Sequence, residues 1–387
     1  MLLFGAHSAS AQGFAGYLRL GGGGNVGGGT QACFQMPGAP VKYRLGNECE
    51  LYGEFELAHA IDLGEPGREL TVDGMVSLYN SYGNRPVFAG ENGSARLPQL
   101  WASLTVPALA GGSVWLGRRY YKRHDIHICD FYYWNPSGTG GGIENYGLGG
   151  TTLSYQFSFE DNSAQEHPAN RHDLNVGNIA TSHDGAIEIG LSLIQASKVA
   201  GAQGGWSLAA EHRQRMLLGG ENRLVAQYGV GPGTGLGQTG DLTADRHVRR
   251  WRVLESALFQ PTRRMGGMML LLVERNLSPT REETWYSAGA RASCAVTERF
   301  KLVGEIGHDR IRGREDDLRM LSKFTLAPVL AVGPEFMRRP ELRAYYTYAA
   351  WNRVAQQAAG DGTALAGDGP FGGLEGATIG IQLETWW

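Results

Sequence analysis

Residues 123–135, RHDIHICDFYYWN, bring together five side chains of types that bind metal ions: His124, Asp125, His127, Cys129 and Asp130. An H-x-x-H pair, His124 and His127, with a nearby Cys and Asp suggests zinc or copper. On an extended strand, however, only Asp125, His127 and Cys129 share one face. The chain also contains no C-x-x-C or H-E-x-x-H pattern. We therefore predict no metal site and no cofactor.

The same segment could be read as part of a glycosidase. Such an enzyme needs two carboxylates held across a sugar bond. Glu54 and Asp130 can be imagined in that role, but nothing in the sequence positions them as acid and nucleophile. We predict that the protein is not an enzyme, so the segment needs another explanation from the rest of the chain.

Composition favours strands and turns over helices. Glycine accounts for 58 of 387 residues, about twice its usual share, and Tyr, Trp and Phe are frequent. The net charge of -3 predicts no nucleic-acid partner. The longest apolar run, Met268–Val273, is far too short for a membrane-spanning helix. If the protein crosses a membrane, it must therefore do so as a closed β-barrel.

The N-terminus and the cysteines indicate export. MLLFGAHSASAQ has a short apolar core followed by Ala9-Ser10-Ala11, an A-x-A cleavage pattern. We expect residues 1–11 to be the remnant of a signal peptide and residues 12–387 to form a single domain. In an exported protein Cys33 and Cys49, which lie close together in a Gly/Pro-rich loop, are a plausible disulfide. Cys129 and Cys294 are then unpaired or joined over a long distance.

Short alternating segments recur from Phe14 to Trp387 with no linker between them. About seventeen can be counted, including 14–20, 49–61, 70–82, 113–122, 184–197, 301–309 and 377–387. Bacterial single-chain barrels have an even number of strands, so a barrel of this kind would have one strand more than these segments show. The glycine-rich stretches 21–30 and 229–240 are predicted to be loops. The second lacks the G-K-[ST] of a phosphate loop.

Alternation also assigns side chains to the two faces of the wall. In 186–194 (AIEIGLSLI), apolar and polar residues alternate, as on a strand with one face in lipid. The same parity turns Leu18 and Leu20 outward. It therefore places Tyr17 and Arg19 in the lumen, and elsewhere Tyr52 and Trp386. Aromatic rings with ionisable neighbours in an aqueous lumen favour a path for sugars, whose C–H faces stack on rings while their hydroxyls bind polar groups.

The chain resembles the maltoporins, trimeric 18-stranded sugar porins of the bacterial outer membrane. The resemblance is carried by GYLRLGGG (16–23), CFQMPGAPVKYRLGNECELYGEFEL (33–57), VWLGRRYYKRHDIHICDFYYWNPSGTGGGIENYGLG (114–149) and LETWW (383–387). It implies an all-β transmembrane antiparallel barrel in outer-membrane lipid, with a constriction loop folded inward. It also implies a homotrimer that passes maltose and maltodextrins by facilitated diffusion. A porin for another sugar, such as sucrose, or for general solutes is the alternative.

The resemblance further implies roles for individual residues. An aromatic slide for sugar rings comprises Tyr17, Tyr52, Phe88, Met337 and Trp386, with Phe88 lent to the neighbouring subunit and Leu224 at one more slide position. A polar track comprises Arg19, Arg44, Glu54, Arg96, Arg123 and Asp130. Tyr132 forms the constriction, and Asn135 stands where the family often has Asp. The family's first-loop disulfide falls on Cys33 and Cys49.

Overall fold

A computed structural model describes residues 12–83, 93–160, 169–195, 198, 200–215, 217–314, 317–360, 365 and 373–387. Two predictions fall outside these residues: the signal-peptide remnant 1–11 and the slide residue Phe88. In the described part of the chain, no helix has both the length and the apolar character needed to cross a membrane.

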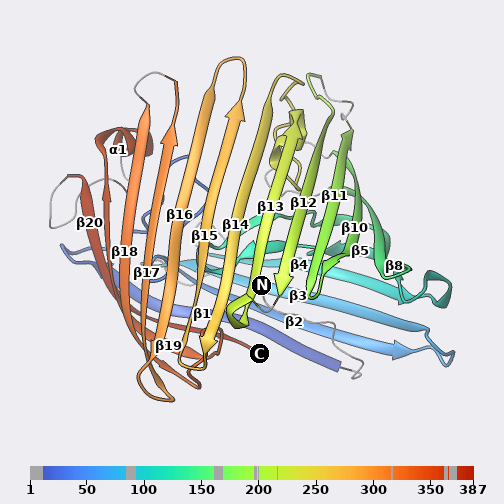
Figure 1. The fold of residues 1–387 in the computed structure, drawn as a ribbon, viewed down its shortest axis with the longest axis horizontal. Helices are drawn as coiled ribbons and strands as arrows, with labels where there is room; N and C mark the ends of the chain where they lie inside the picture. The colour runs from blue at the N-terminus through green and yellow to red at the C-terminus, as the bar shows by residue number, and fades with distance from the viewer. Residues whose placement is uncertain are drawn as a thin grey trace.

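Eighteen strands form one antiparallel sheet that closes on itself, because β1 pairs with both β2 and β20 (Figure 1). The predicted 18-stranded barrel is confirmed, and the count of about seventeen segments was one short. The strands are β1 (Gln12–Asn25), β2 (Glu50–Asp62), β3 (Glu69–Ser81), β4 (Gly93–Thr105), β5 (Ser113–Arg119), β8 (Gly138–Leu148), β9 (Thr151–Glu160), β10 (Asn170–Ser182), β11 (Gly185–Gln195), β12 (Gly205–Arg215), β13 (Glu221–Val230), β14 (Arg249–Thr262), β15 (Met265–Leu277), β16 (Glu282–Ala295), β17 (Phe300–Arg312), β18 (Leu318–Ala331), β19 (Glu341–Trp351) and β20 (Glu375–Trp386).

Side chains alternate between an apolar outer face and a polar or packed inner face. On β20, Ile379 and Ile381 are exposed on the outer face, whereas Thr378 and Gln382 are buried inside. Trp387 packs outside against Phe14, with ring centroids 5.6 Å apart. The strands therefore present one row of side chains to the outside of the barrel and the other to the lumen.

The two ends of the barrel differ in the length of their connections. At one end the strands are joined by short turns, such as those between β2 and β3 and between β10 and β11. Both described termini lie at this end, where β1 begins and β20 finishes (Figure 1). The opposite end carries the long connections, including 26–49 and 120–137, and the short helix α1 (Arg353–Ala359). Long loops at one end and short turns at the other are usual for outer-membrane barrels, in which the long loops are external.

One local prediction was wrong, because the first glycine run does not begin a loop. Residues 21–24 continue β1, and their backbones pair with Ile379–Gln382 of β20. This inter-strand pairing compensates for the weak strand propensity of glycine. A Cβ at Gly23 would lie 2.1 Å from the Gln31 Oε1 and 2.9 Å from the Ile379 carbonyl oxygen, so a side chain there would force its neighbours to shift. The second run, 229–240, does leave the barrel wall as a loop, beginning with a 3-10 turn at Gly231–Gly235.

Candidate functional site

Two long loops fold into the lumen and contact each other there. We call residues 26–49 the first loop and residues 120–137 the constriction loop. The constriction loop contains the short strands β6 (His124–Ile126) and β7 (Phe131–Trp134), which form their own hairpin, and a 3-10 turn at His127–Cys129. The backbone N–H of Arg44 in the first loop donates to the carbonyl of Ile128 at 3.0 Å. The predicted inward-folded loop is thus confirmed, and it is braced by a second one.

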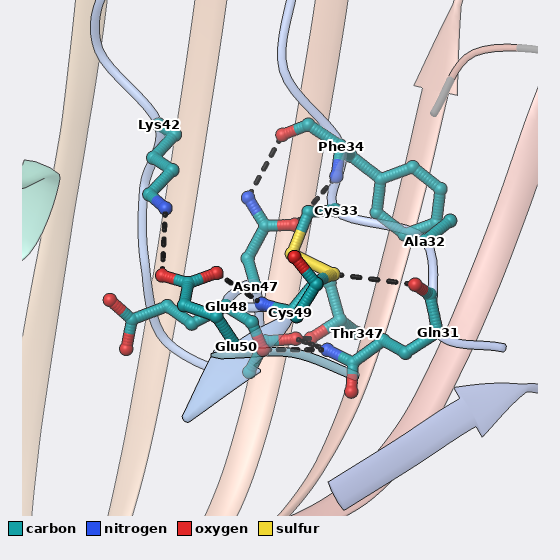
Figure 2. The surroundings of a disulfide bond; sticks show 12 residues. Gln31, Ala32, Cys33, Phe34, Lys42, Asn47, Glu48, Cys49, Glu50 and Thr347 are labelled. Carbon is teal, nitrogen blue, oxygen red and sulfur yellow. Dashed lines mark hydrogen bonds and ion pairs between the residues drawn. A yellow bond between two sulfur atoms is a disulfide. The ribbon is translucent and has the colours of Figure 1, made fainter. Parts of the chain in front are cut away.

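A disulfide between Cys33 and Cys49 closes the first loop (Figure 2). Beside it, the Asn47 side chain accepts from the N–H of Phe34 at 2.7 Å and donates to the Phe34 carbonyl at 2.9 Å. These cross-links give the loop a fixed shape without a regular element of its own. The predicted pairing is confirmed, while Cys129 and Cys294 are free thiols in the part of the chain that the structure describes.

One side of the lumen is filled by these loops. Ile126, Ile128, Cys129, Phe131 and Tyr133 of the constriction loop are buried in one apolar cluster with inward-facing wall residues. The wall contributes Val225, Leu254, Leu270, Leu272, Trp285, Ile311 and Leu321. Cys129 is completely buried there and acts as a small apolar side chain.

The first loop contributes Tyr43 to the same cluster through an unusually close approach to the wall. Its hydroxyl bonds to Ser287 at 2.8 Å. Its ring lies against Gly289 on β16 and Gly307 on β17, where an added Cβ would come within 2.2 and 2.0 Å of it. Glycine at both positions is therefore required for the ring to reach the wall.

The residues that resemble metal ligands have separate partners. His124 binds the wall through Glu211 at 3.0 Å and Glu188 at 3.7 Å, and the Tyr133 hydroxyl donates to Glu211 at 2.7 Å. His127 meets the edge of the Trp386 ring, with centroids 5.6 Å apart. Within the described ranges, no three or more His, Cys, Asp or Glu side chains converge as metal ligands would. The segment's polar groups instead hold the loop to the barrel.

The two histidines titrate in opposite directions. Burial disfavours the charged form of His124, but the Glu211 and Glu188 carboxylates outweigh it and raise its pKa to about 9. Burial and the neighbouring guanidinium groups of Arg44 and Arg339 hold the pKa of His127 well below its ordinary value. At neutral pH one histidine is a cationic anchor of the loop, and the other is a neutral ring beside Trp386.

The other side of the lumen holds a cavity of about 660 Å³. Its walls come from β1 to β5, β20, the constriction loop, the first loop and the turn before β19. It is lined by Tyr17, Arg19, Arg44, Glu50, Tyr52, Glu54, Glu56, Met75, Tyr79, Gln99, Trp101, Arg119, Tyr120, Arg123, Asp125, His127, Asp130, Tyr132, Met337 and Trp386. Ten of the predicted site residues are therefore together: Tyr17, Tyr52, Met337, Trp386, Arg19, Arg44, Glu54, Arg123, Asp130 and Tyr132.

Aromatic rings and charged groups interleave along this cavity. The Tyr17 and Tyr52 rings lie 6.1 Å apart, and the Arg339 guanidinium lies 4.5 Å from the Trp386 ring. The tyrosine hydroxyls bind carboxylates, Tyr17 to Glu384 at 2.8 Å and Tyr52 to Glu54 at 2.6 Å. The rings are thus held at fixed angles, and apolar faces alternate with hydrogen-bonding groups.

Arginines beside these rings are themselves held by carboxylates. Arg19 pairs with Glu48 at 2.7 Å, and Arg44 pairs with Glu48 at 2.8 Å and with Glu384 at 3.1 Å. Arg343 also contacts Glu384. Because these three guanidinium groups are already paired with carboxylates, they can offer hydrogen bonds without a large uncompensated charge.

Tyr132 projects into the cavity from the constriction loop. Its side chain is 39% exposed, although its neighbours Phe131 and Tyr133 are buried. The Arg123 guanidinium lies between the rings of Tyr132 and Tyr120, 4.2 and 3.8 Å from their centroids. This stack fixes the Tyr132 ring in the lining of the cavity.

Three residues are placed differently from the expected site. Arg96 is in register with Ser77 of β3, but it is exposed and does not line the cavity. Asn135 lies outside the cavity and accepts from the Ser137 side chain. Leu224 is 48% exposed on the outer face, so its prediction as a slide position was wrong. The inward side chain is Val225, which is fully buried against the loop cluster.

Sequence reasoning missed several lining residues that the strand parity could have found. Tyr79 is directly opposite Tyr52 in the β2–β3 register and lines the cavity, two residues beyond the inward-facing Ser77. Trp101 and Arg119 come from β4 and β5, with the guanidinium 4.1 Å from the Trp101 ring. Extending the parity argument from β1 and β2 to β3, β4 and β5 would have predicted them.

The chain matches known proteins by sequence family and by fold. The LamB porin family model matches residues 13–387. A structure of OccK2 (OpdF) from Pseudomonas aeruginosa is similar with a TM-score of 0.57 at 10% identity, covering 97% of each chain. OccAB1 from Acinetobacter baumannii gives a TM-score of 0.55 at 9% identity, covering 97% of this chain and 96% of that one. At such identities the solved structures support the barrel fold alone.

The family match and the geometry agree. The family model spans nearly the whole chain, and the structure is a closed 18-stranded barrel with a loop-lined cavity in its lumen. Such a protein is a channel, not an enzyme, and it resides in the bacterial outer membrane. The chain belongs to the LamB porin family.

Proposed function

We propose that this porin passes maltose and maltodextrins by facilitated diffusion. The observation that carries the proposal is one cavity in which Tyr17, Tyr52 and Trp386 lie beside Arg19, Arg44 and Glu54. Ring faces suit the C–H faces of glucose units, and the polar groups suit their hydroxyls. Conduction requires contacts strong enough for entry and weak enough for exit, which neutral sugars on such a track satisfy.

In this proposal Tyr17, Tyr52, Trp386 and Met337 form the slide, and Arg19, Arg44, Glu54, Arg123 and Asp130 form the polar track. Tyr132 narrows the passage from the constriction loop. Met337 reaches both the main cavity and a second one of about 620 Å³ among the short turns. This position suits a last, weaker contact before release, because a thioether is flexible and less directional than an aromatic ring.

Planar-bilayer recording tests the proposal. We expect steady open current that falls as maltohexaose is added, and Trp386→Ala should weaken this block about tenfold, the loss of about 1.4 kcal/mol of stacking. Trp387→Ala is the matched control, because Trp387 lies on the outer face. Current that maltohexaose leaves untouched and sucrose blocks would instead favour a porin for another sugar.

We also propose a homotrimer, with Phe88, which lies outside the described residues, as the slide residue lent to the neighbouring subunit. The support is the family match, since the LamB porin resemblance includes this arrangement. Detergent-extracted protein should migrate as a heat-modifiable trimer on gels. A strict monomer at all concentrations would contradict both the assembly and the role of Phe88.

A further inference from the structure

The outer face of the barrel carries an arginine patch that the channel function does not use. It comprises Arg249 on β14, Arg275 on β15, and Arg310 and Arg312 on β17. All four occupy outward positions near the long-loop end, since they are in register with outward-facing Leu277, Trp251, Tyr286 and Thr284 respectively. Charges at the membrane-facing side of a strand are costly unless something compensates them.

The depth of the patch in the membrane can be derived from the length of β17. On β17 the outward residues Leu302 and Ile306 are 44% and 57% exposed, and they belong to the apolar band that faces lipid chains. From Phe300 to Arg310 the strand advances roughly 33 Å, or about 25 Å along the barrel axis at a tilt near 40°. That is about the height of the apolar band of such barrels. Arg310 and Arg312 therefore lie at its outer edge, level with lipid headgroups.

The patch is positively charged on balance. Glu282 contacts Arg275 and lies 3.4 Å from Arg314 of the next loop. No ion pair or hydrogen bond engages the side chains of Arg310 and Arg312 among the described residues. The patch is defined by strand residues alone, because Glu315 and Asp316 of the adjoining loop lie outside the described part of the chain.

The register makes two of these arginines converge. Arg275, Thr284 and Arg312 occupy one continuous rung across β15, β16 and β17. Neighbouring strands lie about 4.8 Å apart, so the two arginine Cα atoms are about 10 Å apart with the Thr284 hydroxyl between them. Two planar guanidinium forks at this spacing can bind one phosphate from both sides. Arg310, two residues along β17, extends the site toward the apolar band.

We propose that this patch binds the phosphorylated headgroup of a glycolipid in the outer leaflet of the outer membrane. The long-loop end faces outward in such barrels, so the patch lies in that leaflet. The arginines match the phosphates in charge, and the exposed Ile306 and Phe324 directly below match the acyl chains. Arg118 on β5 also faces outward, but it donates to Thr139 at 3.2 Å, so it does not form a second such site.

Binding of purified lipids to the delipidated full-length protein in detergent tests this proposal. The probes are bisphosphorylated lipid A and the same lipid with its phosphates removed, with binding followed by native mass spectrometry. Wild-type protein should retain the phosphorylated form preferentially. The double variant Arg310→Gln/Arg312→Gln should bind it about thirtyfold more weakly, as expected for two basic residues at an anionic membrane surface.

Controls separate this site from general charge and from misfolding. Arg299→Gln/Arg338→Gln removes the same charge at the short-turn end, where both residues line the second cavity, and should bind lipid A like wild type. Each variant's heat-modifiable migration on gels reports its folding independently of lipid. Equal binding by wild type and the Arg310/Arg312 variant would overturn the proposal. So would equal retention of dephosphorylated lipid A, or displacement by millimolar inorganic phosphate alone.

Discussion

The two sides of the lumen are built from the same alternating strands but are used differently. Along β13 to β18 the inward residues are packed against the two infolded loops, and several are large and apolar, such as Leu254 and Trp285. Along β1 to β5 and β20 the inward residues face an open cavity and are mostly aromatic or charged. Inward-facing positions in this barrel are therefore apolar in one region and polar or aromatic in another. The difference arises because the infolded loops cover some inward residues and leave others exposed to water.

The two edges of the constriction loop also differ in their surroundings. One edge carries Ile128, Phe131 and Tyr133 into the packed side, and the other presents Asp130 and Tyr132 to the cavity. Asp130 can make this change of direction because its backbone is left-handed, with φ 52°. Tight packing behind the loop holds the front edge in a fixed position at the cavity.

The largest effect is expected from Trp285→Ala, on the packed side. Trp285 is 1% exposed, meets the edge of the Phe131 ring with centroids 6.0 Å apart, and donates to Asp309 at 2.9 Å. Its removal leaves a cavity and should lower the free energy of unfolding by about 3–5 kcal/mol. Thermal or denaturant unfolding in detergent measures this. The outward-facing Trp206→Ala should cost much less, and equal losses would show that the packed side is no tighter than the outer face.

The second-largest effect is expected from the charge of His124, which anchors the constriction loop to the barrel wall. The folded-state pKa of His124 is raised from its ordinary value near 6.5 to about 9. The stabilisation from its charge is therefore fully present below about pH 6.5 and is lost as pH rises through about 9. Between pH 7 and 10 we expect a falling unfolding temperature and noisier open current.

His124→Gln provides the control for this pH effect. Glutamine keeps a polar side chain beside Glu211 and Glu188 but has no titrating charge, so the variant should be less stable at pH 7 and nearly flat up to pH 10. If the unfolding temperatures of wild type and variant fell in parallel as the pH rises, groups other than His124 would be responsible for the loss of stability.

A smaller change is expected from Tyr132→Ala, at the loop's open edge. Because the ring is 39% exposed in the cavity, its loss should widen the passage and raise single-channel conductance with little change in stability. Tyr346→Ala removes a tyrosine of similar exposure from the outer face and should leave conductance unchanged. Unaltered current through the Tyr132 variant would remove this residue from the constriction.

The open side could be predicted from the sequence better than the packed side. Alternation alone turned Tyr17, Tyr52 and Trp386 inward, because a period of two depends only on local strand geometry. The packing of the loops could not be predicted in this way. Contacts such as Tyr43 with Ser287 join residues 244 positions apart, and no local pattern specifies which wall a loop meets. The need for glycine at positions 289 and 307 likewise follows only from the position of the Tyr43 ring, which packs against both.

The smallest effect is expected at Leu224, where resemblance and parity disagree. On β13 the parity of neighbouring Gln227 and Val225, both buried, turns Leu224 outward, and the structure agrees. Leu224→Trp should therefore leave maltohexaose block within about twofold of wild type, because a ring there meets lipid and not sugar. Val225→Ala, one residue away, should loosen the packed side and cost about 1.5 kcal/mol of stability for its lost buried methyl groups. If Leu224→Trp tightened sugar block, β13 would have to be shifted by one residue, and every inward assignment on that strand would be reversed.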